Sequence, residues 1–183
     1  MTALAALLAE PPPPVAAPPL KLALERREDR AAVDALVADA FGPGRFAKTA
    51  ERLREGAVLA AGSSWCAWSG GELVGAVRTW PVRIGPSPAL FLGPVAVARS
   101  WRRRGLGALL VERACEASYA AQGALVLLVG DRPFFEPLGF DPVPAGRIAM
   151  PGPVDGRRVL WRALRPGALD GVSGPVRAPE RPA

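Results

Sequence analysis

Residues 90–110 constrain the fold of this chain more than any other segment. The first part, up to Val97, is apolar at nearly every position, which is typical of a strand buried on both faces. A basic turn with two glycines, Gly105 and Gly107, follows, and a helical pattern begins inside it and continues to about Ala121. A strand, a glycine turn and a helix in this order present unpaired backbone N–H groups and the positive end of the helix dipole to a phosphate.

Two common phosphate-binding motifs do not fit this turn. A Walker loop ends in Gly-Lys-Ser/Thr, and the turn contains no lysine, whereas the dinucleotide fingerprint needs a third glycine beyond Gly105 and Gly107. The two glycines leave the backbone accessible to an anion, and Arg102, Arg103 and Arg104 add cationic groups at the same place. The alternative interpretation is a basic turn that only caps the helix.

The composition allows one domain and excludes several kinds of site. The chain has 183 residues, half of them apolar, and a net charge of +6. Because it has no histidine, His-based triads and most zinc or iron sites are excluded, and we expect no metal. Cys66 and Cys115 lie in apolar patterns, so we interpret them as buried core residues and expect a reducing, cytoplasmic location.

The pattern along the chain predicts a mixed sheet with helices. Strands are expected at 20–25, 58–61, 64–68 and 73–84 before the central run, and at 124–129, 147–150 and 158–164 after it, the last two being antiparallel. The pair 58–61 and 64–68 could also be a single bulged strand. Helices are expected at 28–40 and 46–54, and a brief one near Pro133. The order strand, helix, strand around residues 90–129 predicts a parallel crossover.

The two ends of the chain differ in composition from the middle. We expect residues 1–19, rich in Pro and Ala, to be a disordered extension, residues 20–166 to form the domain, and residues 167–183 to be a tail that covers the surface or frays. The apolar run at the start is far shorter than the ~20 residues of a membrane span, so we expect no membrane association.

The motif Arg102-x-x-Gly105-x-Gly107 resembles the acetyl-CoA pyrophosphate loop of the GNAT superfamily of N-acetyltransferases, written Q/R-x-x-G-x-G/A. Its context is also similar, with Gly-Pro-Val-Ala-Val at 93–97 before it and Leu-Gly-Phe at 138–140 after it. Gly-Val-Ser-Gly-Pro-Val at 171–176 resembles the tail of a bacterial subgroup of small predicted N-acetyltransferases. The resemblance covers about residues 20–164 and implies an α/β (α+β) GNAT fold: a mostly antiparallel mixed sheet with a central splayed parallel strand pair, flanked by helices.

The resemblance also implies a site for acetyl-CoA as co-substrate. Backbone groups of 95–97 would pair with the pantetheine amides, and the N–H of Val95 or Ala96 would polarise the thioester carbonyl. The turn would take the pyrophosphate. Pro94, unusual in a buried strand, would mark the bulge that opens this site; the alternative is a proline tolerated at a strand start. The expected cofactor-binding residues are Val95, Ala96, Val97, Arg102, Arg103, Arg104, Gly105, Leu106, Gly107, Ala108 and Phe135.

The catalytic residues are unknown from the sequence. Many family members carry, four residues before the glycine of the Gly-Phe pair, a tyrosine that protonates the departing thiolate; here that position is Phe135. The only tyrosine, Tyr119, is interpreted as a packing or surface residue. Asp131 and Glu72 are weak candidates for a general base, with a helix cap and a solvated turn residue as their respective alternatives.

Three functions were compared on these grounds. The first is an acetyl-CoA-dependent N-acetyltransferase that modifies a primary amine by direct attack in a ternary complex. The second, favoured by Phe135, is a non-catalytic acyl-CoA-binding protein. The third, a basic nucleic-acid-binding protein, would need arginines interleaved with aromatics, and the basic turn offers only Trp101, so nucleic acid is the least expected partner. The acceptor and the oligomeric state are not encoded in any recognisable pattern.

Overall fold

The structure is a computed structural model that describes residues 18–42 and 49–179. Its strands are β1 (Leu20–Leu24), β2 (Trp65–Ser69), β3 (Glu72–Ile84), β4 (Ser87–Val97), β5 (Leu125–Val129), β6 (Asp141–Pro142), β7 (Ile148–Ala149), β8 (Val159–Ala163) and β9 (Gly174–Arg177). Its helices are α1 (Arg30–Phe41), α2 (Thr49–Arg52), α3 (Leu106–Ala120) and α4 (Arg132–Phe135), and short 3-10 turns lie between them. The main strand order is β1-β2-β3-β4-β5-β8-β6.

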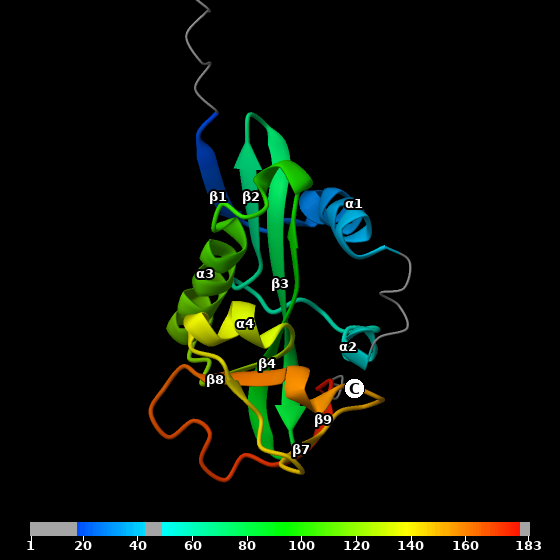
Figure 1. Cartoon of the computed structure of the whole chain (residues 1–183), viewed down its shortest axis with the longest axis vertical. Helices are drawn as coiled ribbons and strands as arrows, with labels where there is room; N and C mark the ends of the chain where they lie inside the picture. Colours follow the sequence, from blue (N-terminus) through cyan, green and yellow to red (C-terminus); the bar gives the residue numbers. More distant parts are fainter. Residues whose placement is uncertain (1–17, 43–48, 180–183) are drawn as a thin grey trace, which may run out of the picture.

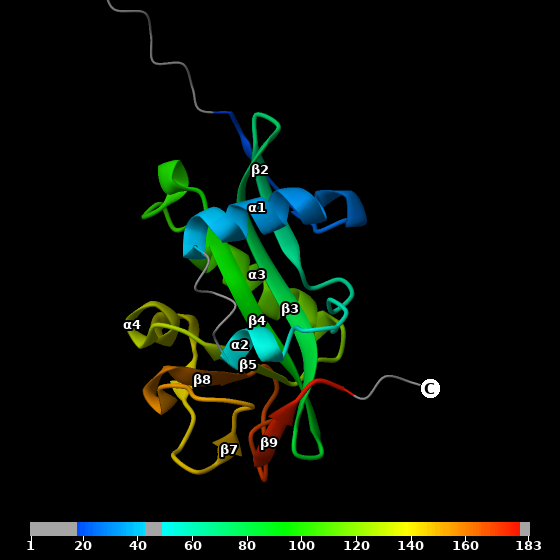
Figure 2. The ribbon, with the colours of Figure 1, turned by 90° about the vertical axis from the view of Figure 1, so that its right-hand side faces the viewer.

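The two long helices cover opposite faces of this sheet. Figure 1 shows α3 on one side of β3 and α1 on the other, and in Figure 2 α1 lies in front of the strands with α3 behind. α3 buries residues spaced three or four apart, among them Leu106, Leu110 and Ala114, because such spacing places them on one side of a helix. α1 does the same with Val33 and Val37, so both faces of the sheet are covered by apolar surface.

Most of the sheet is antiparallel and is built from hairpins. The β2–β3 turn uses Gly70 and Gly71, with φ of +58° and +84°. A two-residue hairpin turn with positive φ at both positions matches the twist of the strands it joins, which is why glycines occupy it. Strands expected at 20–25, 64–68, 73–84, 124–129 and 158–164 are confirmed with small shifts of their ends.

The centre of the sheet contains the irregularity expected at Pro94. β3 and β4 pair on both sides of Arg78, but two β4 residues, Gly93 and Pro94, oppose that single residue, which makes a bulge. The Trp80 indole N–H donates a hydrogen bond to the carbonyl of Gly93 over 2.7 Å and holds the bulge from the β3 side.

The parallel pair β4 and β5 diverges just before this bulge. Their pairing consists of Leu90 with Val126 and Phe91 with Leu127. Beyond Phe91, β4 has no partner on its β5 side within the described residues. The mixed sheet with a central splayed parallel pair is therefore confirmed.

Three expectations about the outer elements need correction. Residues 58–61 form no strand, because they lie between two turns with positive φ at Gly56 and Gly62. Within this segment, the N–H of Ala60 donates a hydrogen bond to the Thr79 carbonyl of β3. β7 covers only part of 147–150 and pairs parallel with β9, not antiparallel within the main sheet. In the tail, expected to cover the surface or fray, β9 pairs with the far end of β3. The helix expected at 46–54 is described only from Thr49, and residues 1–17 lie outside the described part.

Candidate functional site

A cleft of about 810 Å³ opens where β4 and β5 diverge. The β4 bulge forms its floor, and its walls come from the start of α3, from α4, from the ends of α1 and α2, and from residues 153–158. Most of the residues predicted to bind a cofactor line it, namely Val95, Val97, Arg102, Arg103, Gly105, Leu106, Gly107, Ala108 and Phe135. Two separate segments of the chain that were predicted to bind a cofactor therefore meet at one cleft.

The glycine turn has the backbone geometry of an anion site. Within the described residues, the N–H groups of 103–108 donate to no backbone carbonyl, and three of them lie in the first turn of α3. Gly105 has φ of +79° and Arg103 has φ of +62°, left-handed conformations that reverse the chain in front of the helix. The Arg102 Nε donates to the Val97 carbonyl over 3.0 Å and so holds the turn against β4.

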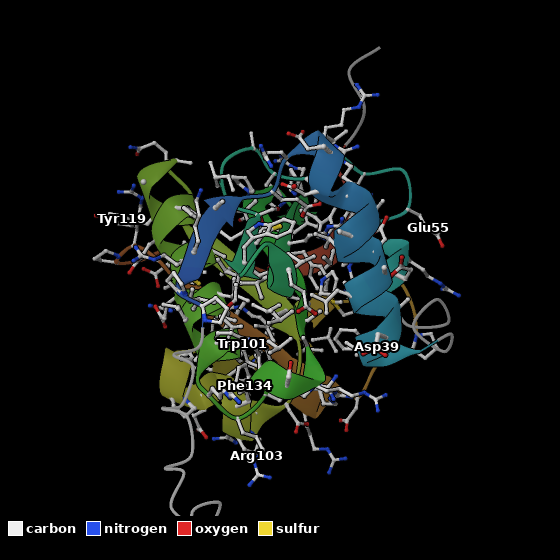
Figure 3. All side chains as sticks on the ribbon, turned by 90° about the horizontal axis from the view of Figure 1, so that it is seen from above. Asp39, Glu55, Trp101, Arg103, Tyr119 and Phe134 are labelled. Carbon is white, nitrogen blue, oxygen red and sulfur yellow. The ribbon has the colours of Figure 1, made fainter. Side chains whose placement is uncertain are left out.

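Gly107 allows α3 and α4 to approach each other at the cleft. A Cβ on this residue would lie 3.3 Å from Cζ of Phe134 and 3.8 Å from Cγ2 of Val97. Trp101, Arg103 and Phe134 all line the cleft, and in Figure 3 they lie on one side of the molecule, whereas Tyr119 on α3 lies on another. Tyr119 is half exposed under the Arg165 guanidinium, as the interpretation of a surface residue requires.

Two predicted cofactor residues do not line the cleft with their side chains. The Arg104 guanidinium lies 5.5 Å from the centre of the Trp101 ring. Ala96 is buried under α1 among Val33 and Val37. The role predicted for Ala96 concerned its backbone groups, and this role does not depend on where the methyl group lies.

Phe135 forms an apolar wall at the position where the family resemblance implies a tyrosine. Its ring contacts those of Phe134 and Phe140 edge to face, at centroid distances of 4.8 Å and 5.7 Å. A Cβ on Gly130 would overlap the Phe135 ring, so the missing side chain of Gly130 is what makes room for it. No hydroxyl is present at this wall, since phenylalanine carries none.

The two candidate bases are placed differently. Asp131 lines the cleft; its backbone carbonyl accepts from the N–H groups of Phe134 and Phe135, while its carboxylate makes no capping hydrogen bond. Glu72 begins β3 at the exposed hairpin, away from the cleft. The structure therefore brings Asp131, and not Glu72, to the site.

Sequence patterns gave no indication of the charged residues that enter the cleft from distant segments. Arg54, in the turn after α2, donates to Glu51 over 2.9 Å and lies 5.7 Å from the centre of the Phe91 ring. Asp155 and Arg158 come from the segment before β8, and hydrogen bonds from Arg157 lower the pKa of the Asp155 carboxyl. Neither segment carries a recognisable motif, because contacts between residues far apart in the sequence bring it to the cleft.

The described residues give little support to other chemistries. Burial raises the pKa of the Cys66 thiol to about 12 and that of Cys115 to about 11, so both are neutral thiols at physiological pH. In residues 18–42 and 49–179 no group of three or more His, Cys, Asp or Glu side chains is arranged to hold a metal ion. No helix in the same ranges is long and apolar enough to span a membrane.

Several solved structures are similar to this chain. The GNAT family N-acetyltransferase YhbS from Escherichia coli, in complex with CoA, aligns with a TM-score of 0.77 and 25% identity over 89% of this chain and 91% of that one. A GNAT family acetyltransferase from Brucella melitensis, in complex with acetyl-CoA, gives 0.56 and 22% over 79% and 97%. The ribosomal-protein-S18-alanine N-acetyltransferase from Escherichia coli gives 0.56 and 18% over 79% and 94%.

The sequence comparisons agree with this fold. No curated protein matches the chain. The sequence model of the acetyltransferase (GNAT) family matches residues 30–140, which include α1, the β4 bulge, the glycine turn and α4. On this match, on the splayed strand pair and on the glycine turn, the chain belongs to the GNAT acetyltransferase family.

Proposed function

We propose that this protein is an acetyl-CoA-dependent N-acetyltransferase that modifies a primary amine. The observation that carries the proposal is the continuous cleft from the anion-binding turn at Gly105 to the divergence of β4 and β5. The relatives crystallised with CoA and with acetyl-CoA support the same ligand. The two buried cysteines, free in the structure, are consistent with the cytoplasmic location that we also propose.

In this proposal each part of the cleft has one task. The N–H groups of 103–108 and the guanidinium of Arg103 hold the pyrophosphate. The edge of β4 at Val95–Val97 that has no strand partner, and where the Val97 carbonyl accepts from Arg102, pairs with the pantetheine arm and orients the thioester, which supplies the acetyl group. The acceptor amine then attacks directly, because neither buried, neutral cysteine can serve as a nucleophile.

The cleft has few groups that could transfer a proton. Asp131 is the carboxylate in the cleft that we propose as the base for the amine, directly or through water. Phe135 offers no proton to the leaving group. Thiols ionise near pH ~8.5, so the sulfur can leave as a thiolate without an acid, at some loss in rate. A non-catalytic acyl-CoA-binding protein is the second candidate function, and the apolar ring of Phe135 is the observation that favours it.

Titration calorimetry with acetyl-CoA, followed by thiol detection over a panel of amines, tests both functions. Gly107→Val would place a branched side chain between Phe134 and Val97, and we expect acetyl-CoA affinity to fall at least about tenfold. Ala120→Val, at the exposed end of the same helix, is the matched control and should bind normally. Normal affinity in a folded Gly107→Val variant would refute the proposed cofactor site. Binding by the wild type without CoA release from any amine would favour the non-catalytic candidate.

A further inference from the structure

The bulge in β4 is held by a hydrogen bond from a side chain of β3. Gly93 and Pro94 together oppose the single residue Arg78, so the regular ladder is interrupted there. The Gly93 carbonyl accepts a hydrogen bond from the indole N–H of Trp80 over 2.7 Å. Both residues are buried, so without this donor the carbonyl would be a buried acceptor that has lost its partner.

This hydrogen bond turns the Gly93 carbonyl toward one face of the sheet. Trp80 lies two residues from Arg78 on β3, so the two side chains share a face. That face is the one covered by α1, because Arg78 donates to Oδ1 of Asp34 on α1 over 2.5 Å. Trp80, Arg78, Asp34 and Arg54 also line a cavity of about 440 Å³ there. The Gly93 carbonyl therefore leaves the plane of the sheet on the α1 side.

The register of β3 and β4 shows which N–H group beyond the bulge faces the divergence of β4 and β5. The N–H of Ala98 donates to the Val74 carbonyl of β3. In an antiparallel pair, the backbone groups of successive residues point alternately to the partner strand and away from it. Ala96 therefore directs its N–H to β3, whereas Val95, which lines the cleft, directs its N–H to the side from which β5 has diverged. Of the two N–H groups that could polarise the thioester carbonyl, that of Val95 faces the cleft.

We propose that Trp80 is a positioning residue for acyl transfer: by holding the Gly93 carbonyl, its indole N–H keeps the N–H of Val95 directed at the thioester carbonyl. Trp80 does not line the cleft, so it acts through the backbone. Only Pro94 separates the two groups, and because its ring fixes φ, the soft torsion left between the Gly93 carbonyl and the Val95 N–H is ψ of Pro94. This inference rests on the proposed function and adds a residue to it.

The test follows the thioester itself, with acetyl-CoA that carries ¹³C at the acetyl carbonyl. On binding to the full-length protein, polarisation by the Val95 N–H should move this carbon resonance downfield of its position in free acetyl-CoA. Trp80→Phe removes the indole N–H and keeps an aromatic ring, and we expect it to lose more than about half of this displacement. Its calorimetric affinity for CoA, which lacks the thioester, should change by less than about threefold, because the glycine turn is untouched.

Trp161→Phe is the matched control. Trp161 belongs to the same buried cluster as Trp80, but it lies on β8 and does not line the cleft. The substitution removes a similar amount of packing, so the displacement should stay as in the wild type. If Trp80→Phe does not fold, benzothienylalanine at position 80, with sulfur in place of the N–H in a ring of almost the same shape, gives the same comparison.

Each other outcome has a defined meaning. An unchanged displacement in Trp80→Phe, or an equal loss in Trp161→Phe, would overturn the inference, as would a wild-type resonance that binding does not move. With an amine that releases CoA, kcat should fall at least about tenfold in Trp80→Phe while KM for acetyl-CoA changes little. Release at the wild-type rate would refute the inference and leave the proposed function standing. The expected loss of displacement without CoA release from any amine would do the reverse.

Discussion

At the residue scale, Phe135 bears most on the proposed activity, because it stands where the family resemblance implies a proton donor. It lines the cleft at 9% exposure and is held by Phe134, Phe140 and the space left by Gly130. A ring fixed in this way can exclude water from the site but cannot protonate a thiolate. With phenylalanine at this position, the protein is either a slow enzyme or a binding protein, and the release of CoA distinguishes the two.

Phe135→Tyr is expected to increase turnover if thiolate departure limits the rate, by at most ~10²–10⁴, the usual effect of a positioned acid. The ring volume hardly changes, so acetyl-CoA affinity should stay the same. Thiol release across an amine panel and several pH values measures the effect. Phe140→Tyr is the control, because Phe140 is fully buried: an unpaired hydroxyl there should cost ~1–3 kcal/mol of stability and give no gain in rate. An active wild type with a strongly inhibited Phe135→Tyr variant that still binds acetyl-CoA would show that the ring must be apolar.

The two cysteines should make stability fall at alkaline pH. Burial raises the pKa of Cys66 to about 12 and of Cys115 to about 11, against 9.0 for a free thiol. Their contribution is complete below pH 9 and is lost as the pH rises toward the folded-state pKa, by at most ~1.4 kcal/mol per pH unit for each thiol. Urea unfolding between pH 8 and 11 measures this slope. A double variant with alanine at both positions should have a smaller slope, and an unchanged slope would contradict the assignment to the thiols.

At the scale of elements, the start of α3 is the part of the chain that we propose binds the anionic part of the cofactor. A strand, a turn in left-handed conformation and a helix place the N–H groups of Arg103 and of residues 105–108 beside the cleft. These groups have no backbone partners in the described residues. Arg103 and Arg104 are neighbours in sequence, but only Arg103 lines the cleft, because its positive φ turns the chain between them.

Arg103→Asn and Arg104→Asn form a matched pair that tests this difference. Asn tolerates the φ of +62° at position 103, so the first substitution removes charge without adding backbone strain. We expect acetyl-CoA affinity to fall about tenfold in Arg103→Asn and by less than about threefold in Arg104→Asn. Calorimetry at low and high salt gives both values. A larger loss in Arg104→Asn would mean that Arg104 leaves Trp101 to bind the ligand, as the sequence motif suggests.

At the scale of the whole molecule, residues 172–177 of the C-terminal tail pack onto the core of the domain. β9 pairs with Arg83 and Ile84 at the end of β3, beyond the reach of β2, whose pairing with β3 ends at Val77. Val172 and Val176 are buried in the cluster that contains Trp80 and Phe91. The tail therefore supports the end of the sheet at the start of β4, whereas the cleft opens toward the other end of that strand.

Removing residues 167–183 is expected to destabilise the domain, because each buried valine contributes ~1.5–3 kcal/mol. Thermal and urea unfolding measure the loss. Deleting residues 1–17 is the comparison: their proline-rich sequence predicts a change of only a few degrees, and the deletion keeps the Pro18 carbonyl that accepts from Ser69. A tail deletion with unchanged stability would restore the expectation that this segment only covers the surface.

The sequence by itself determined the elements whose signals are local: the apolar run of β4, the glycine turn and the spacing of α3. Such signals act through the conformational preferences of neighbouring residues, so they can be read without knowing the fold. Tertiary structure alone decided that β9 joins β3, that residues 58–61 form no strand, and that Asp34, Arg54 and Arg78 meet at one cavity. Ion pairs and edge-strand pairing depend on which segments come together in space, and residues as far apart in the sequence as Glu25 and Arg78 leave no periodic or local pattern of their association.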